Sequence, residues 1–293
     1  MHSGGEDLEL FQLLWNALPS DLFDTQIAAS FVGFDRQAGL QRLLRETLQV
    51  ELGKEETRSD WTKRPLTDSQ RHYAAEDVRH LFKLAQLLEE RLQILDRAGW
   101  CREECDALLN KYRDKTPDDQ LYLSYSSAAR FKPEQQAAMQ HLVSWREQQA
   151  RKRDIPRTFI AKDAIIYGLV EKQPRHRGAL EELGLQGGQI RRWGDELLKQ
   201  LQVGLQQGKP TQPIPEPLSK RQQALYKELR DVVAALATEL GLPPELLASK
   251  AQLTDYLQIH LQGGDESHVF TGWRARILLP RLQAHRFSTN DYN

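Results

Sequence analysis

The residues from Thr67 to Leu95 constrain the fold more than any other stretch of this chain. Thr67 and Gln70 have the spacing of a capping box, in which each side chain accepts a hydrogen bond from the other residue's backbone N–H group. Apolar residues then recur at helical period, at Ala74, Val78, Leu81, Ala85, Leu88, Leu92 and Leu95. The pattern predicts one long helix that begins at Thr67 and buries one face.

Tyr73 and Asp77 lie one turn apart on this predicted helix, on a face at the edge of the apolar stripe. We therefore expect Asp77 to be half buried. A half-buried carboxylate needs a cation, hydrogen-bond donors or a metal ion as its partner, and a phenol one turn away can orient a water molecule beside that metal. The spacing alone leaves a simpler alternative open, in which Tyr73 is an aromatic residue at the core edge and Asp77 is an exposed charge.

The surrounding residues resemble the third exonuclease motif of ribonuclease D, a family of DEDD exonucleases in the subclass marked by tyrosine. The matching residues are Lys54, Ser59-Asp60-Trp61, Arg64-Pro65-Leu66, Gln70 and the run from Tyr73 to Val78. Two further segments agree in order and distance: His2 to Leu8 resembles the family's second motif, and Phe23 to Gln26 resembles the segment after it.

The resemblance implies a 3′–5′ exoribonuclease that trims the 3′ ends of tRNA precursors and other structured RNAs by hydrolysis with two Mg²⁺ or Mn²⁺ ions. It makes Tyr73, Asp77 and Asp7 catalytic residues. Asp77 would hold the ion on the water side, Asp7 would help to hold the second ion, and Tyr73 would orient the attacking water. Asp7 also falls near the start of a helix expected from a Ser3–Glu6 capping box, where a carboxylate is favoured without any metal.

One motif of the family has no match. Ribonuclease D-like enzymes take their first two acidic residues from an Asp-x-Glu on a strand that precedes the segment matching His2 to Leu8. Asp7-Leu8-Glu9 cannot replace it, because residues two apart on a helix do not share a face. We therefore expect an N-terminally truncated chain that is mainly α, with an incomplete ribonuclease H-like α/β exonuclease domain followed by two helical HRDC-like bundles. The alternative function is a non-catalytic RNA-binding remnant.

The domain organisation follows from further signals. Pro133 suits the first turn of a new helix, and the residues from Arg153 to Leu201 resemble the HRDC module of ribonuclease D and RecQ-type helicases. Leu242 to Leu247 and Gly272-Trp273-Arg274 resemble a second, divergent copy. The expected parts are an exonuclease domain at 1–131, an HRDC domain at 132–207, a proline-rich linker at 208–217, a second HRDC-like domain at 218–285 and a tail at 286–293. A short strand is expected at 21–23, with Asp24 capping the next helix.

Charge is unevenly distributed. Residues 1–131 hold 17 Lys/Arg against 23 Asp/Glu, a net of −6, whereas residues 132–212 hold 14 against 9, a net of +5. A basic helical module suits phosphate contacts, which position RNA without reading its sequence, and disfavours a scaffold with no nucleic-acid role. An ordinary solvated surface remains an alternative. The expected RNA-binding residues are Lys54 and Arg58 in a loop, and Arg151, Lys152, Arg153, Arg157, Lys162, Arg175, Arg177, Arg191 and Arg192 in the basic module.

No apolar run approaches the roughly 20 residues of a membrane span, and the first residues lack the pattern of a signal peptide. We expect a cytoplasmic monomer whose partner is RNA and not a membrane. The two cysteines, Cys101 and Cys105, cannot complete a four-ligand zinc site by themselves and are expected to be unpaired thiols on a helix.

Overall fold

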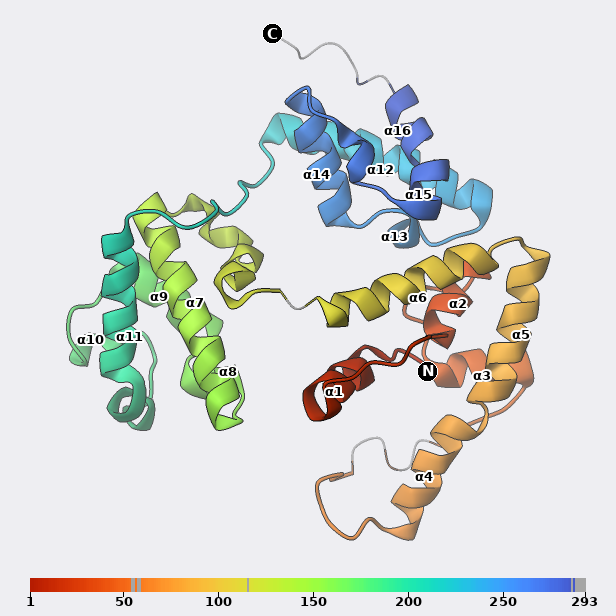
Figure 1. Cartoon of the computed structure of the whole chain (residues 1–293), viewed down its shortest axis with the longest axis horizontal. Helices are drawn as coiled ribbons and strands as arrows, with labels where there is room; N and C mark the ends of the chain where they lie inside the picture. Colours follow the sequence, from red (N-terminus) through yellow and green to blue (C-terminus); the bar gives the residue numbers. More distant parts are fainter. Residues whose placement is uncertain (54–55, 57–58, 115, 286, 288–293) are drawn as a thin grey trace. The chain divides into compact units, whose positions relative to one another are not determined.

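The computed structural model describes residues 1–53, 56, 59–114, 116–285 and 287 (Figure 1). Within these residues every regular element is a helix, and there is no β-strand. The prediction of a mainly α chain is therefore confirmed. The strand expected at 21–23 is wrong, because a strand persists only when a neighbouring strand takes its backbone hydrogen bonds. The chain forms two compact units, residues 1–114 with 219–293, and residues 115–218.

The first part of the first unit is built around one apolar helix. Leu84, Leu88 and Leu92 of this helix, α5, are buried against neighbouring helices of the same part. They follow one another at a spacing of four residues, which places them on one face. The helices are α1 (Gly5–Trp15), α2 (Thr25–Phe31), α3 (Leu40–Leu48), α4 (Asp68–Arg79), α5 (Leu81–Ile94) and α6 (Ala98–Arg113).

The single long helix expected to begin at Thr67 is wrong, because the chain breaks at His80 into α4 and α5. His80 ends the first helix and caps the second, and its carbonyl accepts the N–H of Leu84 at 3.0 Å. The apolar stripe is divided by this break. Its α5 residues are packed against α2, α3 and α6, whereas Val78 on α4 is 63% exposed.

Asp24 ties the N-terminal segment to α2. Its Oδ1 caps α2 by accepting the Gln26 N–H at 2.8 Å, as expected, and its Oδ2 accepts the Gly4 N–H at 2.7 Å. The Ser3 N–H is also bonded to Oδ1, at 3.1 Å. The Ser3–Glu6 capping box is therefore wrong: Gly4 is the N-cap of α1 and no side chain caps it, because Asp24 accepts from the backbone that leads into this helix.

The C-terminal helices belong to the same unit, and the helix that carries Trp273 is packed on α6. Trp273 is 1% exposed, and its ring is stacked on Trp100 with centroids 5.0 Å apart. Glu104 on α6 accepts from the Trp273 indole N–H at 2.9 Å and from Arg274 Nη2 at 2.7 Å. These helices are α12 (Lys220–Leu240), α13 (Pro244–Leu247), α14 (Lys250–Leu261), η3 (Glu266–His268), α15 (Gly272–Ile277) and α16 (Leu279–Ala284).

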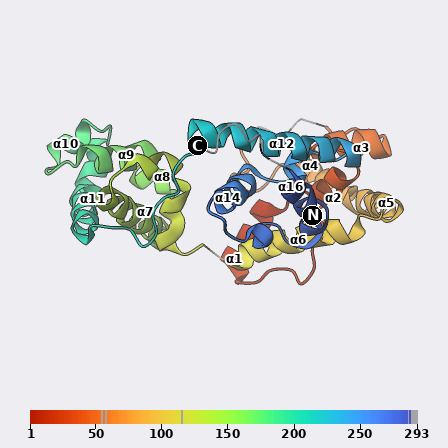
Figure 2. The ribbon, with the colours of Figure 1, turned by 90° about the horizontal axis from the view of Figure 1, so that it is seen from above.

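The second unit is a bundle around the pair α7 and α11, which lie side by side in both views (Figures 1 and 2). Gly204 permits their close approach, since a Cβ at this position would lie 2.4 Å from Ala138 Cα. Pro133 stands in the first turn of α7, as expected. The elements are η1 (Asp118–Ser124), η2 (Ser126–Arg130), α7 (Pro133–Arg153), α8 (Arg157–Ile160), α9 (Asp163–Lys172), α10 (Gly178–Glu181) and α11 (Gly187–Gln207).

The proline-rich segment at 208–217 is attached to this bundle. Ile214 is buried in its core, and the Ile214 N–H donates to Gln136 Oε1 at 2.9 Å. The Thr211 N–H similarly donates to Gln140 Oε1 at 3.1 Å. The segment is therefore fixed by α7 over these residues and is part of the same compact unit.

Candidate active site

Tyr73 and Asp77 line one pocket of about 240 Å³ beside α4. The capping box that begins α4 is formed as expected: the Gln70 N–H donates to Thr67 Oγ1 at 3.1 Å, and the Thr67 N–H donates to Gln70 Oε1 at 3.0 Å. It sets the register that places Tyr73 and Asp77 on the pocket side. The other lining residues are Glu51, Leu52, Gly53, Glu56, Ser69, His72 and Glu76.

Two side chains attach the preceding loop to α4, and sequence reasoning assigned neither this role. Gln70 is 5% exposed, and its Nε2 donates to Ser59 Oγ and to the Asp60 carbonyl, both at 3.2 Å. Trp61 lies against Tyr73 with ring centroids 5.9 Å apart. A glutamine that closes a capping box is normally solvated, so the box itself does not indicate that Gln70 is buried. The only signal in the sequence for this attachment of the loop is Trp61, the aromatic residue that precedes the box.

Asp77 is a carboxylate without a partner among the described residues. It is half-buried, as expected, and the structure gives its side chain no hydrogen bond or ion pair to any described residue. Burial raises the pKa of Asp77 above its ordinary value because water solvates the ionised form less well there. The neighbouring Glu76 differs, since Arg79 and His80 both contact it and hydrogen bonding by Arg79 lowers its pKa. Within the part of the chain that the structure describes, Asp77 is thus the acidic group of α4 without an ion pair, and its carboxylate is available to a cation.

Asp7 does not join this pocket. It is exposed in the first turn of α1, and it is not among the described residues that line the pocket of Asp77. Helix α1 is packed on α6, whereas α4 is packed on α5 (Figure 1). The structure therefore brings Tyr73 and Asp77 together and leaves Asp7 apart from them.

The described residues do not complete a metal site. No group of three or more His, Cys, Asp or Glu side chains in this part of the chain is placed to hold an ion. The oxygens of Asp77, which have no partner among the described residues, suit a hard divalent cation, which would take its further ligands from water, phosphate or other carboxylates. Cys101 and Cys105 are buried free thiols, as expected, and a mutual hydrogen bond together with burial raises the pKa of Cys101.

The nine expected RNA-binding residues of the second unit are all exposed. Two of them are compensated by carboxylates: Arg151 pairs with Asp118 at 2.7 Å, and Arg177 pairs with Asp195. Most of the others have no ion pair within the described ranges, namely Lys152, Arg153, Lys162, Arg175, Arg191 and Arg192. Lys54 and Arg58 lie outside the described residues.

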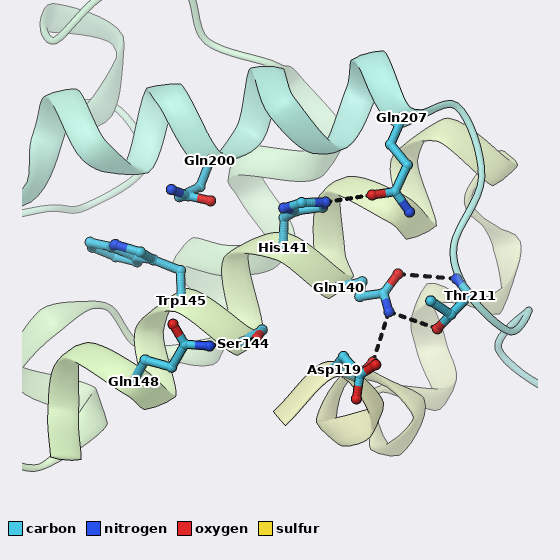
Figure 3. Close-up of a pocket in the computed structure, with 9 residues that line it drawn as sticks. All are labelled: Asp119, Gln140, His141, Ser144, Trp145, Gln148, Gln200, Gln207 and Thr211. Carbon is cyan, nitrogen blue, oxygen red and sulfur yellow. Dashed lines mark hydrogen bonds between the residues drawn. The ribbon is translucent and has the colours of Figure 1, made fainter. Parts of the chain in front are cut away.

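The second unit also holds a polar pocket of about 350 Å³ (Figure 3). His141 Nε2 and Gln207 Oε1 are 2.6 Å apart across it, and Gln140 Nε2 donates to the Asp119 carbonyl at 2.9 Å. Its lining residues include one carboxylate and no Lys or Arg, so it does not suit a phosphate. The remaining lining residues are Ser144, Trp145, Gln148, Gln200 and Thr211. The polar lining residues of α7 recur at helical spacing, at Gln140, Ser144 and Gln148, and this polar stripe is a signal that sequence reasoning missed.

Comparison with protein families divides the chain into three matches. Residues 1–93 match the family described as 3′-5′ exonuclease, residues 135–201 match the HRDC domain, and residues 221–282 match the ribonuclease D C-terminal HRDC domain. None of the helices that the structure describes has the length and apolar character to span a membrane.

Known relatives match nearly the whole chain. Ribonuclease D of Serratia proteamaculans is 33% identical over 97% of this chain and 78% of its own length. Ribonuclease D of Pseudomonas paraeruginosa is 34% identical over 94% of this chain and 74% of its own length. The crystal structure of Escherichia coli RNase D, described as an exoribonuclease involved in structured RNA processing, superposes with a TM-score of 0.83 at 28% identity, covering 96% of this chain and 77% of that one. Together with the exonuclease and HRDC matches, these relatives place the chain in the ribonuclease D family of 3′–5′ exoribonucleases, enzymes that bind RNA and use divalent metal ions.

Proposed function

We propose that this protein trims the 3′ ends of tRNA precursors and other structured RNAs by hydrolysing the last phosphodiester bond. Membership of the ribonuclease D family supports the reaction type, and the involvement of the Escherichia coli enzyme in structured RNA processing supports the substrate class. We infer that the protein works as a monomer in the cytoplasm. The proposed parts are the exonuclease domain at 1–131, the HRDC domain at 132–207, the linker at 208–217, the second HRDC-like domain at 218–285 and the tail at 286–293.

The observation that carries the proposal is the shared pocket of Tyr73 and Asp77. In this proposal two Mg²⁺ or Mn²⁺ ions, when bound, activate the water and stabilise the leaving oxygen. Asp77 contributes an incompletely solvated carboxylate that no other described residue pairs with, and such a group gains more from a cation than a fully solvated one does. Tyr73, held by its contact with Trp61, orients the attacking water through its hydroxyl.

Asp7 is proposed as a ligand of the second ion. It is exposed and unpaired within the described part of the chain, so its carboxylate is available. Its position on a helix that is packed on α6 means that α1 must approach α4 when substrate and metal bind. The basic residues of the second unit, together with Lys54 and Arg58, would hold the phosphates of the RNA.

The test is degradation of a 5′-labelled tRNA with a 3′ extension, with Mn²⁺, by the wild-type chain and by Asp77→Asn and Tyr73→Phe. We expect stepwise shortening that each substitution reduces by about 10²- to 10⁴-fold. Asp68→Asn is the matched control, since this exposed aspartate in the first turn of α4 pairs with Arg71 and lies outside the pocket. Equal rates for Asp77→Asn and Asp68→Asn would contradict the assignment.

A second candidate is an RNA-binding protein that does not cut. The observation that favours it is that the described residues hold no group of three potential metal ligands. The same labelled tRNA separates the two functions. If it stays intact in the degradation assay, and its binding to the protein weakens steeply as the salt concentration rises, the non-catalytic function is supported.

A further inference from the structure

Phe159 is the most exposed large hydrophobic side chain described in the second unit. It is 64% exposed, whereas the adjacent Ile160 is fully buried in the bundle core. Both lie in the single turn of α8, so the buried residue orients the turn and leaves the phenyl ring in solvent. A largely exposed aromatic ring adds little to the free energy of folding, so the groups around it indicate what it can bind.

The first turn of α11 is attached to the backbone that carries this ring. Gln189 Nε2 donates to the carbonyl of Phe159 at 3.0 Å and to that of Ile160 at 3.3 Å. Arg192 and Trp193 follow Gln189 by three and four residues, so they share its helix face. The hydrogen bonds of Gln189 therefore attach the backbone of α8 to α11 at a position one helical turn before Arg192.

Two guanidinium groups are held in place on this face. Arg153, at the end of α7, and Arg192 lie over the Trp193 ring at 4.7 Å and 4.9 Å from its centroid. Trp193 itself is 5% exposed and cannot accept a further ring. Neither arginine pairs with a carboxylate of the described residues, so both keep their charge available while cation–π contacts order their side chains.

Arg157 adds a third charge, two residues before Phe159. Among the described residues its ion-pair partner is Glu147, at 3.9 Å, which is a long and only partly exposed pair. Asp154, which ends α7 and follows Arg153 directly, is the acidic side chain closest in sequence to these arginines. The face thus combines one free aromatic ring with three arginines, of which two are already ordered.

We propose that Phe159 is a base-stacking residue for single-stranded RNA, with Arg153, Arg157 and Arg192 binding the adjoining phosphates. The proposal rests on the RNA-binding role given above to this unit and names the residue that would hold the bases. Stacking tolerates any base because every base has a π face, while phosphate contacts carry no sequence information. Both properties suit a protein that must hold many different 3′ ends.

The experiment is fluorescence anisotropy with a 5′-labelled single-stranded oligoribonucleotide and the full chain in EDTA, so that no cleavage occurs. Salt is varied over about 50–200 mM, because the slope of log K against log salt counts phosphate contacts. We expect Phe159→Ala to weaken binding by roughly 5- to 150-fold with the slope unchanged, and Phe159→Trp to restore it. Arg153→Gln should instead lower the slope by about one. Val203→Ala, at the other exposed hydrophobic residue of this unit, is the control and should leave binding unchanged.

The outcomes separate this inference from the function on which it rests. Salt-dependent binding by the wild type that Phe159→Ala leaves intact overturns the stacking role but not RNA binding. A Phe159→Ala variant whose slope falls as in Arg153→Gln also overturns it, because the ring would then be acting through the arginines. Absence of salt-dependent binding by the wild type overturns the proposed function itself.

Discussion

Replacement of Trp273 by alanine should detach the C-terminal helices from α6. Trp273 is 1% exposed, and it contacts both rings of an aromatic cluster, Trp100 at 5.0 Å and Phe31 at 5.3 Å between centroids. Its backbone N–H also donates to Glu103 at 2.7 Å. Its aromatic contacts and this hydrogen bond therefore bring segments 170 positions apart into one core.

The expected loss can be estimated from burial. A tryptophan side chain buries about 150–250 Å². At about 25 cal/mol per Å², this area corresponds to about 4–6 kcal/mol, an upper value because the unfolded chain already buries part of it. Large-to-small substitutions of buried aromatic residues cost about 3–5 kcal/mol. We therefore expect the free energy of unfolding of the first unit to fall by about 4 kcal/mol.

Hydrogen–deuterium exchange followed by mass spectrometry reads this loss helix by helix. Protection in α6 and α14 should fall by roughly 10²- to 10⁴-fold, the equivalent of 3–5 kcal/mol, while α7 in the other unit serves as an internal reference. Trp15→Ala removes the same side chain from a position that is 64% exposed and should cost about 0.5 kcal/mol. A Trp273→Ala loss no larger than that of Trp15→Ala would refute the reasoning.

Two further predictions concern carboxylates that hold the backbone or a buried charge. Asp24→Ala leaves the N–H groups of Gly4 and Gln26 without their acceptor, so urea unfolding should show the first unit destabilised by about 2–4 kcal/mol; a change below about 0.5 kcal/mol would contradict this role. Asp163 is paired with the fully buried Arg146 at 2.7 Å. Partial burial raises the pKa of Asp163, but hydrogen bonds from Arg146 and Tyr125 lower it by more, so the pKa lies below its ordinary value. Its contribution to stability is therefore present above the unfolded-state pKa of about 4 and is lost as pH falls through the lower folded-state pKa. Asp163→Asn should remove that part of the acid dependence of unfolding, measured by circular dichroism from pH 7 to 2, and an unchanged profile would exclude the pair as its source.

Local signals in the sequence determined much of the helical structure. The Thr67–Gln70 capping box, the Asp24 cap and Pro133 at the start of α7 are all formed as predicted. Each depends on residues within four positions of one another, so tertiary contacts had little opportunity to overrule them. The spacing of Tyr73 and Asp77 belongs to the same class, and it predicted the half-buried carboxylate correctly.

Tertiary structure alone decided which of these helices are buried and what they hold. Val78 and Leu88 belong to one apolar stripe in the sequence, yet only Leu88 finds neighbours, because α2, α3 and α6 are packed on α5. The separation of Asp7 from the pocket and the docking of Trp273 on α6 likewise depend on segments far away in the chain. A pattern of residues specifies which face of a helix is apolar, but the free energy of burial is gained only where another part of the fold covers that face.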